Sequence, residues 1–555
     1  MTNQPGRFIK FWQELKRRKV VKVIVIYAST TFILLQLISI LIEPLHLPQW
    51  VMTLIIVLLA LGFPIAIIFS WIFDVTSKGI EVTQTDDKSI AVLPFTNDSN
   101  DSSNIYIING LMESILNNLA KIKDLRVLGR TSVEVYRNNP KLIPEIAREL
   151  NVKYIVEGSG QKNGNQLFLT VQLLEAATDK HLWSEQYKKD AKDIFNLQIE
   201  ASKTIADEIQ AIITPVEKQR IEKLPTQNLT AWDFYLKSND EWFSFWLTRN
   251  MLQLENAQNY LLKAIEFDHE FSLAYAQLGQ VYYMIAHFSP SSSNNYWRKA
   301  FRVSKKAIEF DPENGLAYAV LGVVQSNWVW NSAEARISFE RAIEFSPNEK
   351  QVFIDYLFFE SRLGNCKGIK SNINILKNIL STNFTDAFTI DMLNFKLLSC
   401  QGKHKKMAQI AKHKELVSVF IWDHLIVNAF IQSNEFEKAM NFAEVITAQS
   451  VNPIDGLSQK GIIYAMKGDD EKALKVLSDL KDFSKSNFVS PIIFASVYAA
   501  LNNNMKANEY LEQALKERDW RIHDIFEYAP FYKRRDEAWL KEIIRKSWIP
   551  INDNE

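Results

Sequence analysis

Three glycines are the first residues of this chain that could do chemistry, because glycine-rich loops bind phosphate groups through exposed backbone N–H groups. These are Gly158, Gly160 and Gly164. Their spacing differs from GxGxxG, and predicted strands flank them on both sides, where a phosphate loop needs a strand followed by a helix. Asn163-Gly164 is typical of a tight turn between two strands. We therefore predict a β-hairpin at this position and no phosphate site.

Two segments contain histidines that could act in catalysis or in metal binding. His181 lies beside Trp183 on a predicted strand edge, and no carboxylate stands at a spacing that would pair with it. His404 and His413 flank the basic pair Lys405-Lys406, without the ligand set that zinc requires. We interpret the first group as packing or surface residues and the second as a solvated helix face.

An aromatic cluster is the sharpest remaining candidate. Trp242, Phe243, Phe245 and Trp246 lie within five positions of a predicted helix. Packing inside the helical core is the simplest interpretation. The alternatives are a contact with the preceding domain or the wall of a ligand cleft.

Other signals of enzymatic chemistry are missing from the sequence. It contains no P-loop, HExxH, GxSxG or kinase motif. We predict that the protein is not an enzyme, with no catalytic residue, cofactor or metal. With 64 basic and 64 acidic residues the net charge is zero, which argues against nucleic acid as a partner. The sequence has only two cysteines, Cys366 and Cys400, which excludes a disulfide framework and favours a reducing compartment, and their isolation excludes a zinc ribbon or a CxxC motif.

Two apolar runs dominate the amino-terminal part. Residues 23–42 and 50–73 carry no charged residue and are separated by residues 43–49. About 20 apolar residues cross a bilayer as a helix, so we predict a two-helix transmembrane hairpin over residues 23–73. The runs lack the ionisable residues of ion paths, which favours an anchor over a transporter.

The predicted orientation follows from the leader, residues 1–22. This segment is basic, and its Phe8, Phe11, Trp12 and Leu15 share one helical face. Basic residues remain on the cytoplasmic side. We therefore expect residues 8–73 to contact lipid of the inner (cytoplasmic) membrane as a multi-pass segment, with the soluble part cytoplasmic.

A mixed α/β domain is predicted after a polar linker at residues 74–88. Strand and helix signals alternate over residues 89–150 and are followed by a three-stranded meander and a long amphipathic helix that ends near residue 213. This pattern predicts one domain over residues 89–215. A second linker, residues 216–229, follows it.

Residues 230–549 are predicted to form an all-α solenoid of tetratricopeptide-repeat type with a carboxy-terminal cap. The pattern has a period near 34; Ala439, Ala473 and Ala507, for example, are 34 residues apart. Helices of such repeats cross at small residues. The pattern decays between residues 350 and 430, and we expect seven or eight helix pairs in all. The predicted packing residues are Ala257, Ala264, Tyr275, Gly279, Tyr282, Ala300, Ala307, Pro312, Tyr318, Gly322, Ala335, Phe339, Ala342, Pro347, Ala439, Gly461, Tyr464, Ala473, Ala495, Tyr498, Ala507 and Ala514.

Several segments resemble a known family. SIAVLPF (89–95), NGLMESILNNLAKIKDLRVLGRTSVEVY (109–136) and the stretch from IAREL (146–150) to KDIFNLQIEAS (192–202) resemble the TolB-like (FlgO-related) amino-terminal domain. That domain precedes tetratricopeptide repeats in bacterial class III adenylate cyclases and some winged-helix regulators. Residues 14–23, 47–51 and 59–80 resemble the two-span anchor of membrane-bound members. Relatives usually carry a cyclase domain or a winged helix where this chain has its apolar runs. Their output activity therefore cannot be carried over to this chain.

These observations together predict a multidomain, membrane-anchored, non-enzymatic scaffold of a signalling pathway. Solenoids present a concave face, which is the best candidate surface for a protein partner, although the binding residues are unknown. Any small-molecule ligand of the TolB-like domain is also unknown. Two alternatives remain open: a degenerate adenylate-cyclase-family signalling protein, or an envelope protein with a periplasmic soluble part.

Overall fold

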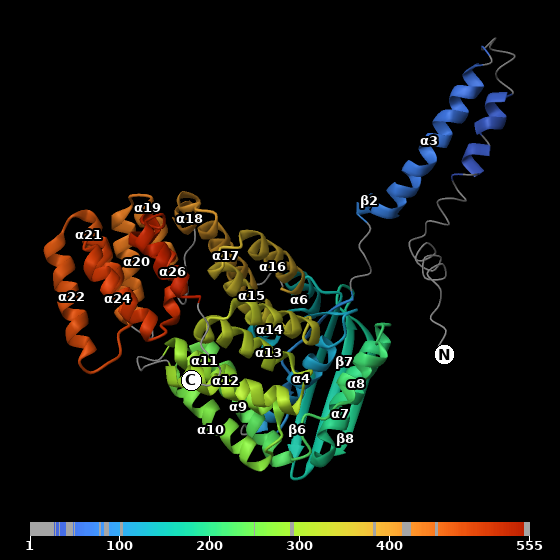
Figure 1. Ribbon diagram of the computed structural model, residues 1–555. Helices are drawn as coiled ribbons and strands as arrows, with labels where there is room; N and C mark the ends of the chain where they lie inside the picture. The colour runs from blue at the N-terminus through green and yellow to red at the C-terminus, as the bar shows by residue number, and fades with distance from the viewer. Residues whose placement is uncertain are drawn as a thin grey trace. The chain divides into compact units, whose positions relative to one another are not determined.

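A computed structural model shows the arrangement of the chain (Figure 1). It falls into two units, residues 1–87 and 88–555, and each is described by itself. The structure describes residues 27, 29–32, 34–39, 48, 50–76, 79–82, 88–99, 101, 104–248, 250–288, 294–380, 384–412, 423–449 and 453–548.

The first unit contains a long helix followed by a small hairpin. Helix α3 spans Trp50–Ile72. Strands β1 (Phe73–Thr76) and β2 (Gly79–Val82) pair antiparallel, with Phe73 opposite Val82. We predicted a polar linker over residues 74–88, so this hairpin is a finding that the sequence pattern did not indicate. The predicted leader, residues 1–22, lies outside the described residues.

The predicted fold class is wrong in its membrane part. Among the described residues, no helix has both the length and the apolar character needed to cross a membrane. The protein is largely helical, with a small sheet and helical repeats, in place of a transmembrane hairpin joined to two soluble domains.

The sheet occupies residues 88–190 and is mixed. Its order is β5-β3-β6-β7-β8, and β4 also pairs with β6. Strand β3 lies parallel to β5 and β6, whereas β6, β7 and β8 form an antiparallel meander. All four residues of β3 are buried, as expected for a central strand in a parallel arrangement. The strands are β3 (Ser89–Val92), β4 (Thr96–Asn97), β5 (Arg126–Leu128), β6 (Tyr154–Asn163), β7 (Gln166–Glu175) and β8 (Lys180–Asp190).

Helices cover both faces of this sheet. Ile90 and Val92 pack with α4 (Ile105–Ala120) and α7 (Ile194–Glu208), whereas Ala91 between them packs with α6 (Ile143–Leu150). This alternation follows from the two-residue period of a strand. Short turns α5 (Arg130–Val133), η2 (Glu134–Tyr136) and η3 (Ala191–Asp193) complete the sheet region, together with α8 (Pro215–Glu222), which occupies the predicted second linker. We call residues 88–222 the sheet region.

Paired helices make up the rest of the chain, here called the repeat region (residues 229–546), and this part of the prediction is confirmed. Eight successive pairs are present within the described residues. They are α9 (Leu229–Thr248) with α10 (Met251–Phe267), α11 (Ser272–Phe288) with α12 (Asn294–Phe310), α13 (Gly315–Val324) with α14 (Ser332–Phe345), α15 (Lys350–Arg362) with α16 (Cys366–Ile379), α17 (Phe384–Cys400) with α18 (His404–Lys412), α19 (Asp423–Gln432) with α20 (Phe436–Gln449), α21 (Pro453–Lys467) with α22 (Asp470–Ser484), and α23 (Pro491–Ala500) with α24 (Asn504–Lys516). Three short elements follow: η5 (Trp520–Glu527), α25 (Ala529–Lys533) and α26 (Ala538–Lys546).

Small residues permit the close approach of these helices. A Cβ atom added to Gly279 on α11 would lie 2.8 Å from Cγ1 of Val320 on α13. Of the predicted packing residues, Pro312 is exposed and Tyr318, Pro347 and Tyr464 are half-buried; the others are buried. Asparagine side chains begin several helices, as at Asn314, which accepts a hydrogen bond from the N–H of Ala317.

The two cysteines, which we expected to be reduced, form a disulfide. Cys366 at the start of α16 is bonded to Cys400 at the end of α17. The sequence could not indicate this pairing, because the two residues are brought together only by the antiparallel turn between consecutive helices.

Candidate ligand cavity

A large cavity lies between the sheet region and the repeat region. Its volume is about 1380 Å³. One wall comes from α4, α5, α7 and α8 of the sheet region. The opposite wall comes mainly from the first helices of successive pairs, α9, α11, α13, α15, α17, α19 and α21, with further residues of α12, α14, α20 and η5. The inner helices of the repeats therefore face the chain's own sheet region over part of their length.

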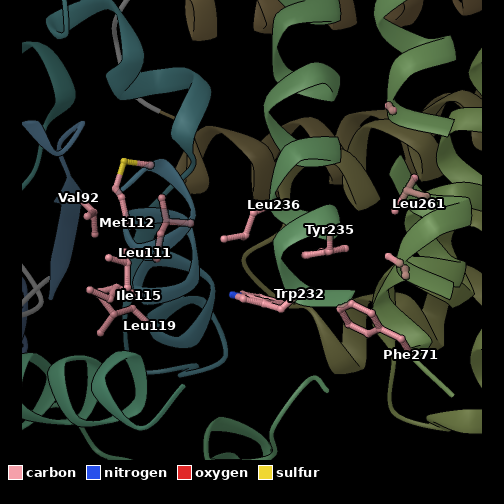
Figure 2. Close-up of a cluster of buried hydrophobic side chains, with 14 of the residues drawn as sticks. Val92, Leu111, Met112, Ile115, Leu119, Trp232, Tyr235, Leu236, Leu261 and Phe271 are labelled. Carbon is pink, nitrogen blue, oxygen red and sulfur yellow. The ribbon is translucent and has the colours of Figure 1, made fainter. Parts of the chain in front are cut away.

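An apolar joint holds the two regions together beside this cavity. Figure 2 shows Leu236 of α9 directed toward α4, where Leu111, Met112 and Ile115 lie. These residues belong to one buried cluster that begins in strand β3 and continues to Phe359 on α15. The approach is so close that a Cβ atom on Gly110 would lie 2.5 Å from Cδ2 of Leu236.

Polar contacts reinforce the joint. Arg130 reaches Glu113 at 3.1 Å within the sheet region and Asp240 of α9 at 3.5 Å. Its guanidinium also lies 4.2 Å from the centre of the Phe243 ring. Asp240 accepts a further hydrogen bond of 3.0 Å from the amide of Asn109. Arg130 is buried, so these partners satisfy a charge that would otherwise be costly to remove from water.

Two carboxylates on the wall, Glu349 and Asp355, have no salt-bridge partner among the residues that the structure describes. Asp355 of α15 accepts a 2.9 Å hydrogen bond from Nε2 of Gln351. Burial raises the pKa of Asp355 to about 7, with a further increase from Glu349, against the opposing effects of Gln351 and Arg362. Glu349 is exposed and lines the cavity, yet protein surrounds it closely enough to raise the pKa of its carboxyl, mainly by desolvation.

A chain of polar contacts continues from this point along the wall. The carbonyl of Tyr283 lies 2.8 Å from Nδ1 of His287, and Nδ2 of Asn327 lies 3.3 Å from Nε2 of the same ring. Burial, followed by the charge of Arg362, lowers the pKa of His287 to about 3, so the ring is neutral. A neutral ring with this geometry donates to the Tyr283 carbonyl and accepts from Asn327.

Asn327 lies in an unusual turn. It belongs to a π-helix, η4 (Gln325–Val329), that extends α13. Such turns are rare and occur often at functional sites. Arg518 donates to the carbonyl groups of Trp328 and Val329 in this turn at 3.2 and 3.4 Å. The turn thereby presents Ser326 and Asn327 to the cavity.

Two further cations near this turn, Arg362 and Lys396, have carboxylate partners. Arg362 donates to both carboxylate oxygens of Asp524, at 3.2 and 3.1 Å, and also to Oδ1 of Asn327. Lys396 forms an ion pair with Glu527, which also lies 2.6 Å from Nε2 of His424. Although burial raises the pKa of Asp524, Arg362 and Lys396 lower it well below its usual value.

The predicted candidate residues are only partly brought together. Trp242, Phe243 and Trp246 line the cavity, whereas Phe245 is fully buried. This arrangement agrees with both alternatives to plain core packing, since Phe243 also contacts Arg130 of the sheet region.

The other candidates lie elsewhere. Gly158 and Gly160 belong to β6, and Gly164 has a positive φ of 58° in the turn that follows. His181 and Trp183 belong to β8. His404 is buried at the start of α18, where desolvation lowers its pKa, and His413 lies outside the described residues. In the part of the chain that the structure describes, no group of three or more residues could hold a metal.

Sequence reasoning missed polar residues that α11 and α15 bring to the cavity. Gln277, Glu349 and Asp355 come from α11 and α15 and from the turn before α15, and no motif connects them. The only available signal was the presence of polar residues on helices whose neighbouring positions are apolar. One sequence cannot show which of these residues face inward.

Part of the chain is similar to known proteins. Residues 86–207 match the model of the second domain of HilA/YgeH-like transcriptional regulators. The more specific resemblance of this region to the TolB-like domain remains a prediction. The chain is also 33% identical over 190 residues to a protein named putative adenylate cyclase 3 from Rhizobium meliloti (strain 1021). The alignment covers 34% of this chain and 32% of that protein, so the chain spans about a third of the relative's length.

Solved structures show a weaker similarity. A tetratricopeptide repeat protein from Parabacteroides merdae is 10% identical, with a TM-score of 0.31, over 58% of this chain and 99% of that one. A human IFIT1 dimer with PPP-AAAA is 15% identical, with a TM-score of 0.31, over 64% of this chain and 77% of that one. Similarities at this level carry no functional argument.

Proposed function

We propose that this protein is a non-enzymatic interaction protein of a signalling or regulatory pathway, and that it binds a segment of a protein partner in the cavity. The size of the cavity carries this proposal. Pockets for small molecules usually have volumes of about 300–1,000 Å³, whereas this cavity has about 1380 Å³. The paired helices supply its longer wall, and stacked helical repeats commonly use their inner face for binding. The matches to a transcriptional regulator domain and to a cyclase-named protein support a regulatory role.

Affinity capture with a cavity-blocking variant tests this function. Val135 lines the cavity and is 52% exposed, so Val135→Trp adds bulk there without disturbing a packed core. Val445→Trp on α20 places the same side chain on an exposed site outside the cavity wall. The tagged wild-type chain and the Val445→Trp variant are expected to retain the same partner, and Val135→Trp is expected to lose it. Equal capture by all three proteins would contradict partner binding in the cavity.

A second function is favoured by the cyclase-named relative. In this alternative the protein is a degenerate member of the adenylate cyclase group and turns over a nucleotide. Purified protein incubated with ATP would then produce cyclic nucleotide above the level of a heat-inactivated sample. Production above the level of the heat-inactivated sample would contradict the non-enzymatic proposal and support this alternative.

A further inference from the structure

The end of the cavity around α15 carries two carboxyl groups, Glu349 and Asp355, whose pKa values are raised mainly by desolvation and only partly lowered again by the charges of Lys350 and Arg362. Within the described residues, no basic side chain lies within salt-bridge distance of Glu349 or Asp355. Glu349 accepts a hydrogen bond from the backbone N–H of Gln351, and Asp355 accepts one from the side chain of the same residue. Glu113 of α4 adds to the negative potential at Glu349, although its own carboxylate is paired with Arg130. This end of the wall is therefore predisposed to receive a cation.

A buried acceptor on the wall of the same cavity calls independently for a hydrogen-bond donor. Gln277 of α11 lines the cavity and is only 3% exposed, and no group of the described chain donates a hydrogen bond to its Oε1 atom. Leaving a buried acceptor unpaired costs about 1–3 kcal/mol. A ligand that donates hydrogen bonds would remove this cost.

Neighbouring cations of the chain cannot fill the role. Lys350 is the first residue of α15, and its ammonium group donates to the hydroxyl of Thr131 in the sheet region. Arg362 acts on Asp355 only over a distance, because its guanidinium is held by Asp524 and Asn327. Lys396 of α17 is paired with Glu527. Tyr283 of α11 and Glu349 are the other titratable groups that influence Asp355.

We propose that Gln277, Glu349 and Asp355 bind a lysine or arginine side chain of the partner polypeptide. Ammonium and guanidinium groups are donors only, which matches three groups that act here as acceptors. The inference rests on the proposed function and adds the chemistry of the bound segment. Because Asp355 takes part as a carboxylate, binding strengthens as the pH rises past the point at which this group loses its proton.

Fluorescence anisotropy on the full chain tests the site with three probes. The first is a fluorescein-labelled glycine-serine octapeptide with two central arginines. The second replaces both arginines with citrulline, which has a similar shape and no charge. The third is free spermidine, used as a competitor. Asp355→Asn removes the charge in the cavity, and Asp479→Asn makes the same change on the exposed face of α22.

The arginine peptide is expected to bind more than about 10-fold more tightly than the citrulline peptide, and more tightly at pH 8 than at pH 6. Asp355→Asn should weaken its binding by at least about 10-fold and remove the pH dependence, with no effect of Asp479→Asn. Failure of the arginine peptide to bind, equal binding of the two peptides, or equal binding by wild type and Asp355→Asn would overturn the inference. If spermidine binds with the same dependence on Asp355 and the arginine peptide does not, the peptide source is wrong and the ligand is a free polyamine.

Affinity capture separates this inference from the proposed function. If Asp355→Asn retains the partner that Val135→Trp loses, the cavity binds the partner and the basic anchor is wrong. If neither substitution affects capture, the proposed function is wrong as well.

Discussion

The ionisation of Asp355 affects the free energy of unfolding of the chain. In the folded chain its pKa is raised to about 7, whereas in the unfolded chain it is near 3.9. Between these values the folded state holds a proton that the unfolded state has released. The free energy of unfolding therefore falls as the pH rises from about 4 to about 7.

Asp355→Asn should remove this loss. We expect the variant and the wild type to be equally stable near pH 4, and the variant to be more stable by about 1–3 kcal/mol at pH 8. Urea unfolding at both pH values measures the difference. A variant that is less stable than wild type at pH 8 would show that the carboxylate makes a favourable contact in the free protein.

Gly110 tests the joint between α4 and α9. Gly110→Ala places a methyl group against the buried side chain of Leu236, and overpacking of this kind costs about 1–3 kcal/mol. Urea unfolding measures the cost. Combining Gly110→Ala with Leu236→Ala should destabilise by less than the sum of the two single substitutions, because the second removes the clash. Additive effects would mean that the two helices do not meet at this point.

At the scale of elements, the repeats depend on alternation between small buried residues and exposed neighbours. Ala473 on α22 is fully buried, whereas Leu474 beside it is 55% exposed. Ala473→Leu should destabilise by about 1–3 kcal/mol, and Leu474→Ala should change stability by less than about 0.5 kcal/mol. Chemical unfolding of both variants checks the prediction. Similar effects at the two positions would contradict this assignment of the helix faces.

The disulfide between α16 and α17 gives a prediction about the compartment. It closes a segment of 34 residues, and cross-links of this kind stabilise by about 2–4 kcal/mol. A reducing agent should therefore lower the melting temperature of the wild type, with no effect on Cys400→Ser. Alkylation of the protein in its native cells would show whether the bond forms there. Free thiols in the cell would favour the reducing compartment that the sequence suggests.

The sequence predicted elements better than contacts. Strands near residues 89, 126, 154, 167 and 181 and helices near 105, 144 and 194 are present, because their periodicity and turn residues act locally. The hairpin at residues 73–82, the helix at 215–222 and the disulfide were missed, since none has a distinctive local pattern. The cavity was missed for a different reason: its wall joins α4 to α15, and such contacts are decided by packing between distant segments.

At the scale of the whole molecule, the two largest buried clusters define two blocks within the described part of residues 88–555. One cluster extends from Ile90 in the sheet to Phe359 on α15, and another contains residues from Phe395 to Ile543 together with Trp330. Residues that share a core tend to open together. We expect amides in β7 and α11 to exchange with a common free energy that Gly110→Ala lowers in both, while α23 is unaffected. Hydrogen exchange with mass spectrometry measures this, and an effect limited to the sheet region would contradict a shared block.

The shared core also limits how this chain can be divided. A fragment that ends where the sheet region ends would leave the face of α4 that normally contacts Leu236 without its cover. Exposed apolar patches of this kind lead to self-association, so such a fragment should be poorly soluble although it contains a complete sheet. A fragment that continues through α15 retains both sides of the joint. The smallest soluble piece of this protein is therefore set by where its apolar surface closes, and the position of its last strand is a poor guide.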